Sequence, residues 1–150
     1  MTRRKVVTWR SGLEELVGGD LTTRGVPFRY EEVKFRYTKP ITTHTYCPDY
    51  ILENGIVIET KGIFDAADRK KHELIRAQHP GLDIRFVFTR SKSTLTKRVP
   101  KAHKNYATQT TYGDWCLKHG FQFADKLIPP EWMAEPNLPS RHEAIEAATA

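Results

Sequence analysis

Two carboxylates and a lysine stand out in the apolar segment 47–62, which reads CPDYILENGIVIETKG. Asp49, Glu59 and Lys61 belong to two strand-like runs on either side of an Asn-Gly pair, which is a common hairpin turn. Carboxylate oxygens are the ligands that Mg²⁺ and Mn²⁺ prefer, and a nearby lysine can orient a water molecule or neutralise charge at a phosphate. These residue types therefore predict metal-assisted hydrolysis, provided that the three side chains meet.

The length of the turn decides whether they meet. A two-residue loop at Asn54-Gly55 would place Asp49 opposite Thr60, on the other face from Glu59. A three-residue loop over 53–55, with its glycine in the left-handed conformation, places Asp49 opposite Glu59 instead. We favour the three-residue loop because it also gathers the apolar side chains on the opposite face, namely Tyr50, Leu52, Ile56 and Ile58.

Other interpretations of the hairpin remain open at this point. Carboxylates directly opposite each other repel, and a divalent cation between them removes that repulsion. A surface hairpin with an incidental Glu59–Lys61 pair is the simpler alternative. Cys47 and His44 could indicate zinc, but two further ligands at zinc spacing are missing.

The composition fits one domain of 150 residues with a net charge of +6. The basic charge is segregated, because residues 1–10 and 84–113 contain lysine and arginine but no acidic residue. This segregation favours a polyanion such as nucleic acid, with a solvated tail and loop as the alternative. We expect an intracellular protein with no membrane contact, since no apolar run reaches about 20 residues and no export signal precedes the two cysteines.

Hydrophobic periodicity predicts an α/β domain with a mixed sheet. In chain order we expect a basic arm (1–9), a weak helix (11–25), one long strand with a bulge at Glu31-Glu32 (26–38), a connector (39–44), the hairpin (45–52 and 56–60), a helix (65–81), a buried strand (82–89), a long basic loop (90–109), a helix (110–120), a short helix (128–133) and a tail (136–150).

The hairpin and the rest of the chain carry a recognisable set of motifs. Pro48-Asp49 followed by Glu59-Thr60-Lys61 fits the PD-(D/E)xK nuclease signature. Over residues 10–136 the chain resembles phage endonuclease I, the Holliday-junction resolvase family of podophages. The resemblance rests on the segments RSGLE (10–14), YEE (30–32), HTY (44–46), ETKG (59–62), DRKKH (68–72), QHP (78–80), LDIR (82–85), KHG (118–120), FADKLIP (123–129) and EW (131–132).

This resemblance implies a restriction-endonuclease-like mixed sheet flanked by helices, in an intertwined, strand-exchanged homodimer. The nuclease domain would cover 10–135, with a bridge to the partner lobe near 38–44. Two Mg²⁺ or Mn²⁺ ions per site would be bound by Glu14, Asp49, Glu59 and the Thr60 carbonyl. The catalytic set would be Glu14, Asp49, Glu59 and Lys61, with Glu14 supplied by the partner chain.

Three positions qualify this picture. Read from the residues alone, Glu14 could close a capping box with Ser11 rather than bind a metal. Arg29 stands where a family relative has an acidic residue, so Glu31 or Glu32 would have to substitute for it. The basic loop 90–109 looks longer than its counterpart in the family.

The implied reaction is the paired hydrolysis of phosphodiester bonds in four-way and other branched DNA. A resolvase must act at any sequence, so we expect shape and phosphate contacts to select the substrate. A mismatch- or restriction-type nuclease and an inactive DNA-structure binding protein are the alternatives. We expect His72 to be a surface residue. The expected phosphate-binding residues are Arg3, Arg4, Lys5, Arg10, Arg69, Lys70, Lys71 and Arg76, together with the basic residues of the 90–104 loop.

Overall fold

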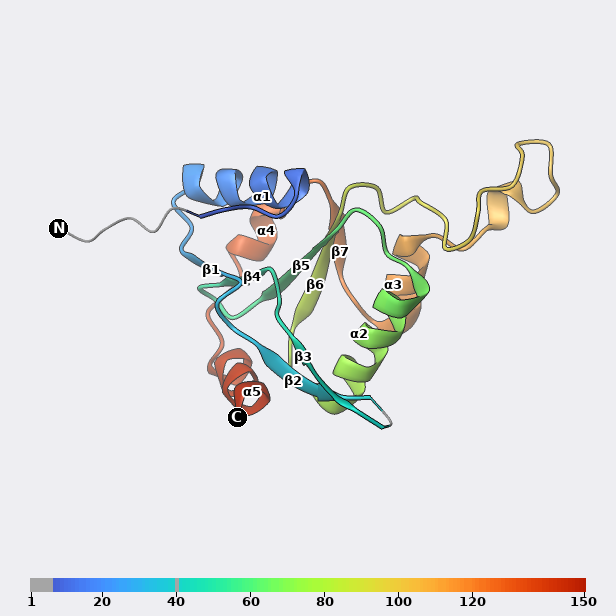
Figure 1. Ribbon diagram of the computed structural model, residues 1–150. Helices are drawn as coiled ribbons and strands as arrows, with labels where there is room; N and C mark the ends of the chain where they lie inside the picture. Colours follow the sequence, from blue (N-terminus) through green and yellow to red (C-terminus); the bar gives the residue numbers. More distant parts are fainter. Residues whose placement is uncertain (1–6, 40) are drawn as a thin grey trace.

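A computed structural model describes residues 7–39 and 41–150, which are built around a five-stranded mixed sheet with helices on both faces (Figure 1). The strand order is β1-β4-β5-β6-β7, with β1, β4 and β5 antiparallel and β5, β6 and β7 parallel. Strands β2 and β3 form a separate antiparallel pair. The elements are α1 (Gly12–Thr23), β1 (Phe28–Tyr30), β2 (Phe35–Thr38), β3 (Thr43–Tyr46), β4 (Tyr50–Leu52), β5 (Val57–Lys61), α2 (Ala66–Gln78), β6 (Ile84–Phe88), a 3₁₀ turn η1 (Tyr106–Thr108), α3 (Tyr112–His119), β7 (Phe123–Asp125), α4 (Pro130–Met133) and α5 (Pro139–Thr149).

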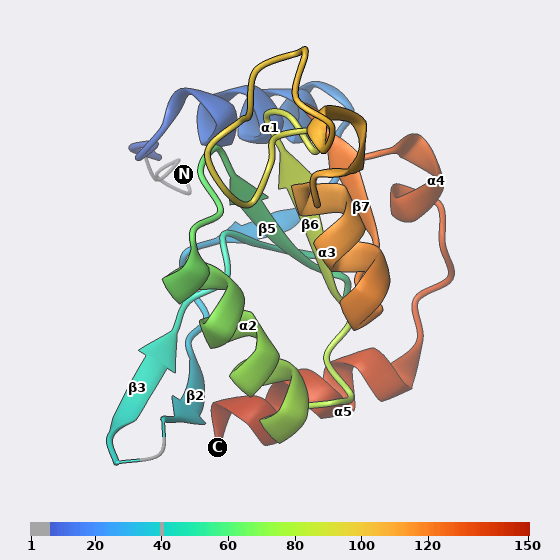
Figure 2. The same ribbon diagram turned by 90° about the vertical axis from the view of Figure 1, so that its right-hand side faces the viewer.

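Each face of the sheet has its own apolar core. Helices α1 and α4 cover one face, where Leu21 and Trp132 pack against Ile58. Helices α2, α3 and α5 and the β2–β3 pair cover the other face, where Ile75 packs with Phe86. Figure 2 shows α2 and α3 side by side in front of the sheet. The predicted mixed sheet flanked by helices is therefore confirmed for the single chain.

The prediction of one long strand over 26–38 is wrong. The side-chain alternation changes where expected, but Glu31 adopts a left-handed φ of 50° and the chain leaves the sheet there. Phe28 and Tyr30 in β1 pack on the α1 face, whereas Phe35 in β2 belongs to the opposite core. The predicted strand 45–52 is divided in the same way, because β3 and β4 belong to different sheets.

Capping residues set the start of α2 and the end of α3, whereas α2 ends at Gln78, before the predicted end at residue 81. The Asp65 side chain accepts a hydrogen bond from the backbone of Asp68 at the start of α2, and Gly120 ends α3 with a φ of 73°. The sequence pattern does not predict β7, which is only three residues long. Residues 136–150, treated above as a tail, carry α5, whose Ile145 and Ala148 lie in the core.

The expected bridge near 38–44 is a hairpin within this chain. Strands β2 and β3 pair with each other, and Lys39 and Thr42 exchange backbone hydrogen bonds of 2.7 and 3.2 Å across the turn. Pro40 lies outside the described residues. Strand exchange with a second chain therefore stays a prediction. In the described part of the chain, no helix has the length and apolar character needed to cross a membrane.

Candidate active site

The β4–β5 hairpin has the predicted three-residue loop. Tyr50 pairs with Ile58, and the backbone N–H of Leu52 donates to the carbonyl of Ile56 over 2.9 Å. Gly55 closes the loop with a left-handed φ of 87°, which a residue with a side chain rarely adopts. Counting outward from this register places Asp49 opposite Glu59, as predicted.

Asp49 lies at the start of β4, where the ladder with β5 ends. Its Oδ2 atom accepts hydrogen bonds from the backbone N–H of Thr60 over 2.8 Å and from the Thr60 hydroxyl over 2.7 Å. Burial raises the pKa of Asp49, and the two bonds from Thr60 oppose that rise. A strand residue directs its N–H and its C=O to the same side, so the Thr60 carbonyl also faces Asp49 rather than β6.

Glu59 is the most deeply buried acid of the site, with 4% of its surface exposed. Its Oε2 atom accepts a 2.7 Å hydrogen bond from the hydroxyl of Tyr46, and its Oε1 atom lies 3.6 Å from the Nζ of Lys61. Burial, followed by the charge of Asp49, raises the pKa of Glu59 to about 8. The ionised form of the Glu59 carboxyl is therefore disfavoured, because the surrounding residues do not fully compensate its negative charge.

Lys61 bridges two acidic groups at the end of β5. Its Nζ atom lies 3.3 Å from an oxygen of Asp68, which belongs to the first turn of α2. Burial favours the neutral amine, but the charges of Glu59 and Asp68 outweigh burial and raise the pKa of Lys61. Lys61 therefore stays a cation, suited to neutralising negative charge.

Glu14 approaches Asp49 from α1. The Ser11 hydroxyl accepts from the backbone N–H of Glu14 over 3.1 Å, so Ser11 is the predicted N-cap. The Glu14 carboxylate does not close a capping box with Ser11. It accepts instead from the Arg10 N–H over 3.2 Å and from the Tyr30 hydroxyl. Glu14 is buried, with 8% of its surface exposed, and its carboxylate does not cap the helix as the alternative interpretation required.

Glu31 is a fourth acid at this site. Among the described residues, carboxylate oxygens of Glu14, Glu31 and Asp49 lie within 4.8 Å of one another. The left-handed backbone of Glu31 turns it back toward β4, where its N–H donates to the Asp49 carbonyl over 3.2 Å. Of the two acids considered as substitutes at position 29, the structure thus brings Glu31 to the group. Glu32 and Arg29 line a separate cavity beside α5.

The predicted DNA-binding residues on α2 contact the protein itself. Lys70 pairs with Glu73 at 3.7 Å, and Lys71 lies over the Tyr46 ring at 5.4 Å. Arg69 donates to the carbonyl of Phe64 over 2.6 Å, and Arg76 donates to that of Gly120 over 3.0 Å. Arg10 pairs with Glu31 at 3.2 Å. Arg3, Arg4 and Lys5 lie outside the described residues, and the DNA-binding role of the whole set stays a prediction.

His72 is not the surface residue that we expected. It is fully buried, and neither ring nitrogen has a hydrogen-bond partner among the described residues. Its ring meets those of Tyr46 and Phe86 edge-on, at centroid distances of 5.2 and 4.8 Å. Burial lowers its pKa well below the ordinary value, so His72 is a neutral core residue. It packs against the ring of Tyr46, whose hydroxyl donates to Glu59.

The donor set suits a hard divalent cation. Among the described residues, three carboxylates, those of Glu14, Glu31 and Asp49, converge, and Glu59 lies opposite Asp49 on the neighbouring strand. Arg10 pairs with Glu31, and Lys61 pairs with Glu59. Oxygen donors of this kind fit Mg²⁺ or Mn²⁺ and do not favour zinc. Burial raises the pKa of both Asp49 and Glu59, and a cation bound beside them would favour their ionised forms.

Comparison with known proteins places this chain in a family. Residues 1–149 match the model of the family described as Phage endonuclease I. The chain belongs to this family. It is 53% identical over 133 residues to "Endonuclease I" of Escherichia phage T7, covering 89% of this chain and 83% of the relative. It is 52% identical over 128 residues to "Endodeoxyribonuclease 1" of Enterobacteria phage T3, covering 85% and 78%. The resemblance seen in the sequence is confirmed, and the chain is a phage endonuclease.

Proposed function

We propose that the chain is a metal-dependent endonuclease that resolves four-way and other branched DNA junctions by paired hydrolysis of phosphodiester bonds. The observation that carries this proposal is the grouping of Glu14 with Asp49, opposite the Glu59–Lys61 pair on the neighbouring strand, in a member of the phage endonuclease I family. The name of the T3 relative supports DNA as the substrate.

Each residue has a role that its surroundings support. Asp49 groups with Glu14 and Glu31 and lies opposite Glu59 in the strand register, so it is suited to a shared ligand. The Thr60 carbonyl would complete the set. Mg²⁺ or Mn²⁺, two per site, would activate water and stabilise charge on the phosphate. Tyr46 holds the Glu59 carboxylate in place. Lys61 offsets negative charge on the scissile phosphate in a poorly hydrated site.

The proposal is tested by gel cleavage of a labelled four-way junction beside a linear duplex of the same sequences. Wild-type protein should cut the junction in symmetric pairs with Mg²⁺ or Mn²⁺ and not with EDTA. Asp49→Asn should bind the junction without cutting it. Glu53→Gln is the matched control, because Glu53 is an exposed acid in the loop of the same hairpin, and it should cut like the wild type.

The possible failures point to different errors. Cleavage by Asp49→Asn, or cleavage in EDTA, would remove the assigned metal site. Equal cutting of the linear duplex would leave a nuclease of another specificity. Tight junction binding by an inactive wild type would indicate a structure-specific binding protein.

We also propose that the active form is a homodimer in which strands are exchanged through residues 38–44. Opening a hairpin turn such as that between β2 and β3 is a common route to exchange, because the same contacts form again between two chains. The dimer's two-fold symmetry would hold two sites at a fixed separation, which suits paired cuts in a branched substrate.

Complementation tests the exchange directly. Glu14→Gln and Asp49→Asn should each be inactive as homodimers, but a co-expressed heterodimer should nick the junction. In the exchanged arrangement one of its two sites combines the intact Glu14 of one chain with the intact Asp49 of the other. Without exchange each site keeps one defect, and the heterodimer stays inactive.

A further inference from the structure

Between β6 and α3 the chain leaves the body of the molecule as an arm, residues 90–109, here called the basic arm. Figure 1 shows it in gold, projecting beyond α3. It contains no acidic residue, and its basic residues are Arg90, Lys92, Lys97, Arg98, Lys101 and Lys104.

The basic arm is anchored and internally bonded. At its base the Leu95 N–H donates to the Thr110 carbonyl over 2.9 Å, and Ser91 donates to both oxygens of Asp125. Farther out, the Gln109 side chain accepts from the Val99 N–H over 3.0 Å. The two limbs are therefore tied together, so the cations are presented by an ordered element.

The cations of the basic arm are exposed, and none forms an ion pair with another described residue. The charged residues of α2, by contrast, already contact acidic groups, carbonyls or rings of the chain itself. The Arg98 guanidinium lies 3.9 Å from the centre of the Tyr106 ring, which holds it beside a groove of about 410 Å³. Arg90 and Lys92 line the same groove. Like charges held together repel one another, so a polyanion is the partner that stabilises this arrangement.

The basic arm starts beside the candidate active site. It follows β6 at the carboxyl end of the parallel strands, where the Thr89 N–H donates to the Lys61 carbonyl over 3.1 Å. Open α/β sheets bind their ligands at this end of the strands. A nucleic acid whose phosphate reaches Lys61 therefore lies close to the base of the arm.

We propose that the basic arm binds the phosphate backbone of a duplex arm of the substrate, away from the branch point. A limb of ten residues spans at most roughly 35 Å, comparable to about ten nucleotides along one strand. Lysine, arginine, serine and threonine contact phosphates without reading base edges, which suits a sequence-independent substrate. The inference rests on the proposed function for the branched substrate, but its contact is with duplex DNA.

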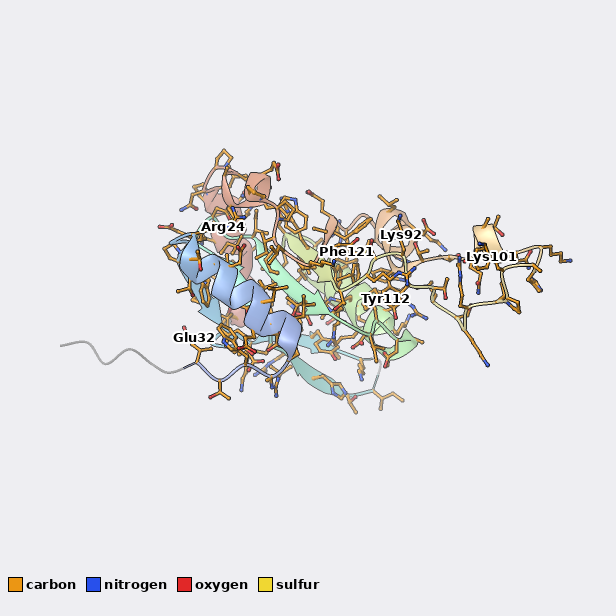
Figure 3. The ribbon with its side chains drawn as sticks, turned by 90° about the horizontal axis from the view of Figure 1, so that it is seen from above. Arg24, Glu32, Lys92, Lys101, Tyr112 and Phe121 are labelled. Carbon is orange, nitrogen blue, oxygen red and sulfur yellow. The ribbon has the colours of Figure 1, made fainter. Side chains whose placement is uncertain are left out.

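The test measures binding rather than cleavage, by fluorescence anisotropy with Asp49→Asn protein over a series of salt concentrations. Two junctions with arms of about 20 and about 6 base pairs, and a linear duplex, are compared. The test variants are Arg98→Gln and the double variant Lys101→Gln/Lys104→Gln. The control is Arg24→Gln, since Arg24 is exposed at the far end of α1 and lies opposite Lys101 in Figure 3.

On long-armed junctions, the slope of log affinity against log salt should fall by about 0.9 for each phosphate contact removed. Affinity should fall several-fold with it, while the short-armed junction and the Arg24→Gln control change little. Unchanged slopes, or an equal loss on the short-armed junction, would overturn the inference. The linear duplex separates this inference from the proposed junction resolution. The arm variants should weaken binding to the linear duplex even if the protein does not resolve junctions.

Discussion

The candidate active site and the basic arm begin at the same edge of the sheet but hold their charges in opposite ways. Asp49 and Glu59 are 9% and 4% exposed, and each accepts hydrogen bonds from fixed donors. The cations of the arm are exposed and unpaired among the described residues. Buried charges interact strongly and depend on one another, whereas exposed charges are screened and act almost independently. Loss of one site residue should therefore be severe, and loss of one arm residue should be incremental.

The strongest test of this contrast is Lys61→Gln. Lys61 compensates both Glu59 and Asp68, so its removal leaves the buried Glu59 and the partly exposed Asp68 without their cation and the phosphate without a positive neighbour. We expect single-turnover junction cleavage to fall on the order of 10²-fold or more. Lys118→Gln, which removes an exposed lysine from α3, is the control and should stay near wild type. If Lys61→Gln lowered the cleavage rate no more than a variant of the basic arm does, the contrast between the coupled charges of the site and the independent charges of the arm would be wrong.

A second test uses the pH dependence of stability without metal. The pKa of Glu59 is about 8 in the folded chain and 4.5 ordinarily, so the fold binds a proton that the unfolded chain releases. The resulting stabilisation is complete below about pH 4.5 and is lost as the pH rises through 8, at up to about 1.4 kcal/mol per pKa unit. The Tm of the metal-free protein should fall over this range.

Glu59→Gln should flatten that pH dependence, because glutamine does not titrate. Adding Mg²⁺ to the wild type at pH 8 should raise the Tm, since a bound cation stabilises the ionised carboxylate. The same decline in Tm for wild type and Glu59→Gln, measured side by side by thermal unfolding, would rule Glu59 out as its source.

The hairpin could be predicted from sequence because its apolar pattern permits one register. Tyr50, Leu52, Ile56 and Ile58 share a face only when the loop has three residues, and a slip of one residue would place the apolar side chains of the two strands on opposite faces. That register places Asp49 opposite Glu59 without further information. Helix ends were similarly accessible, since Ser11, Asp65 and Gly120 act through local hydrogen bonds or local backbone geometry.

Features that depend on distant partners could not be predicted in this way. The change of alternation at Glu31 is compatible with a bulge or with a complete departure from the sheet, and only packing against two separate cores decides between them. Helix α5 has few apolar residues, but its Arg141 is buried through ion pairs with Asp83 and Glu135. His72 lies in a basic run that favours the surface, yet the aromatic rings around it come from β3, β6 and the segment before α2.

Among the site residues, we expect substitution of Glu31 to have the smallest effect on cleavage. The sequence left Glu31 and Glu32 as alternatives, and the structure brings Glu31 to the acidic group. Its carboxylate joins Glu14 and Asp49 but is also paired with the exposed Arg10, so it should contribute to metal affinity without being indispensable. We expect Glu31→Gln to raise the Mg²⁺ concentration for half-maximal cleavage about tenfold, within the range seen for supporting groups at metal sites. Glu32→Gln is the matched control, since Glu32 lines the separate cavity beside α5 and its loss should leave the Mg²⁺ requirement unchanged. An equal response of the two variants would mean that Glu31 affects metal binding only through net charge, as the residues of the basic arm affect DNA binding. Glu31 would then belong with the exposed, independent charges, and Glu14 with the buried, coupled ones.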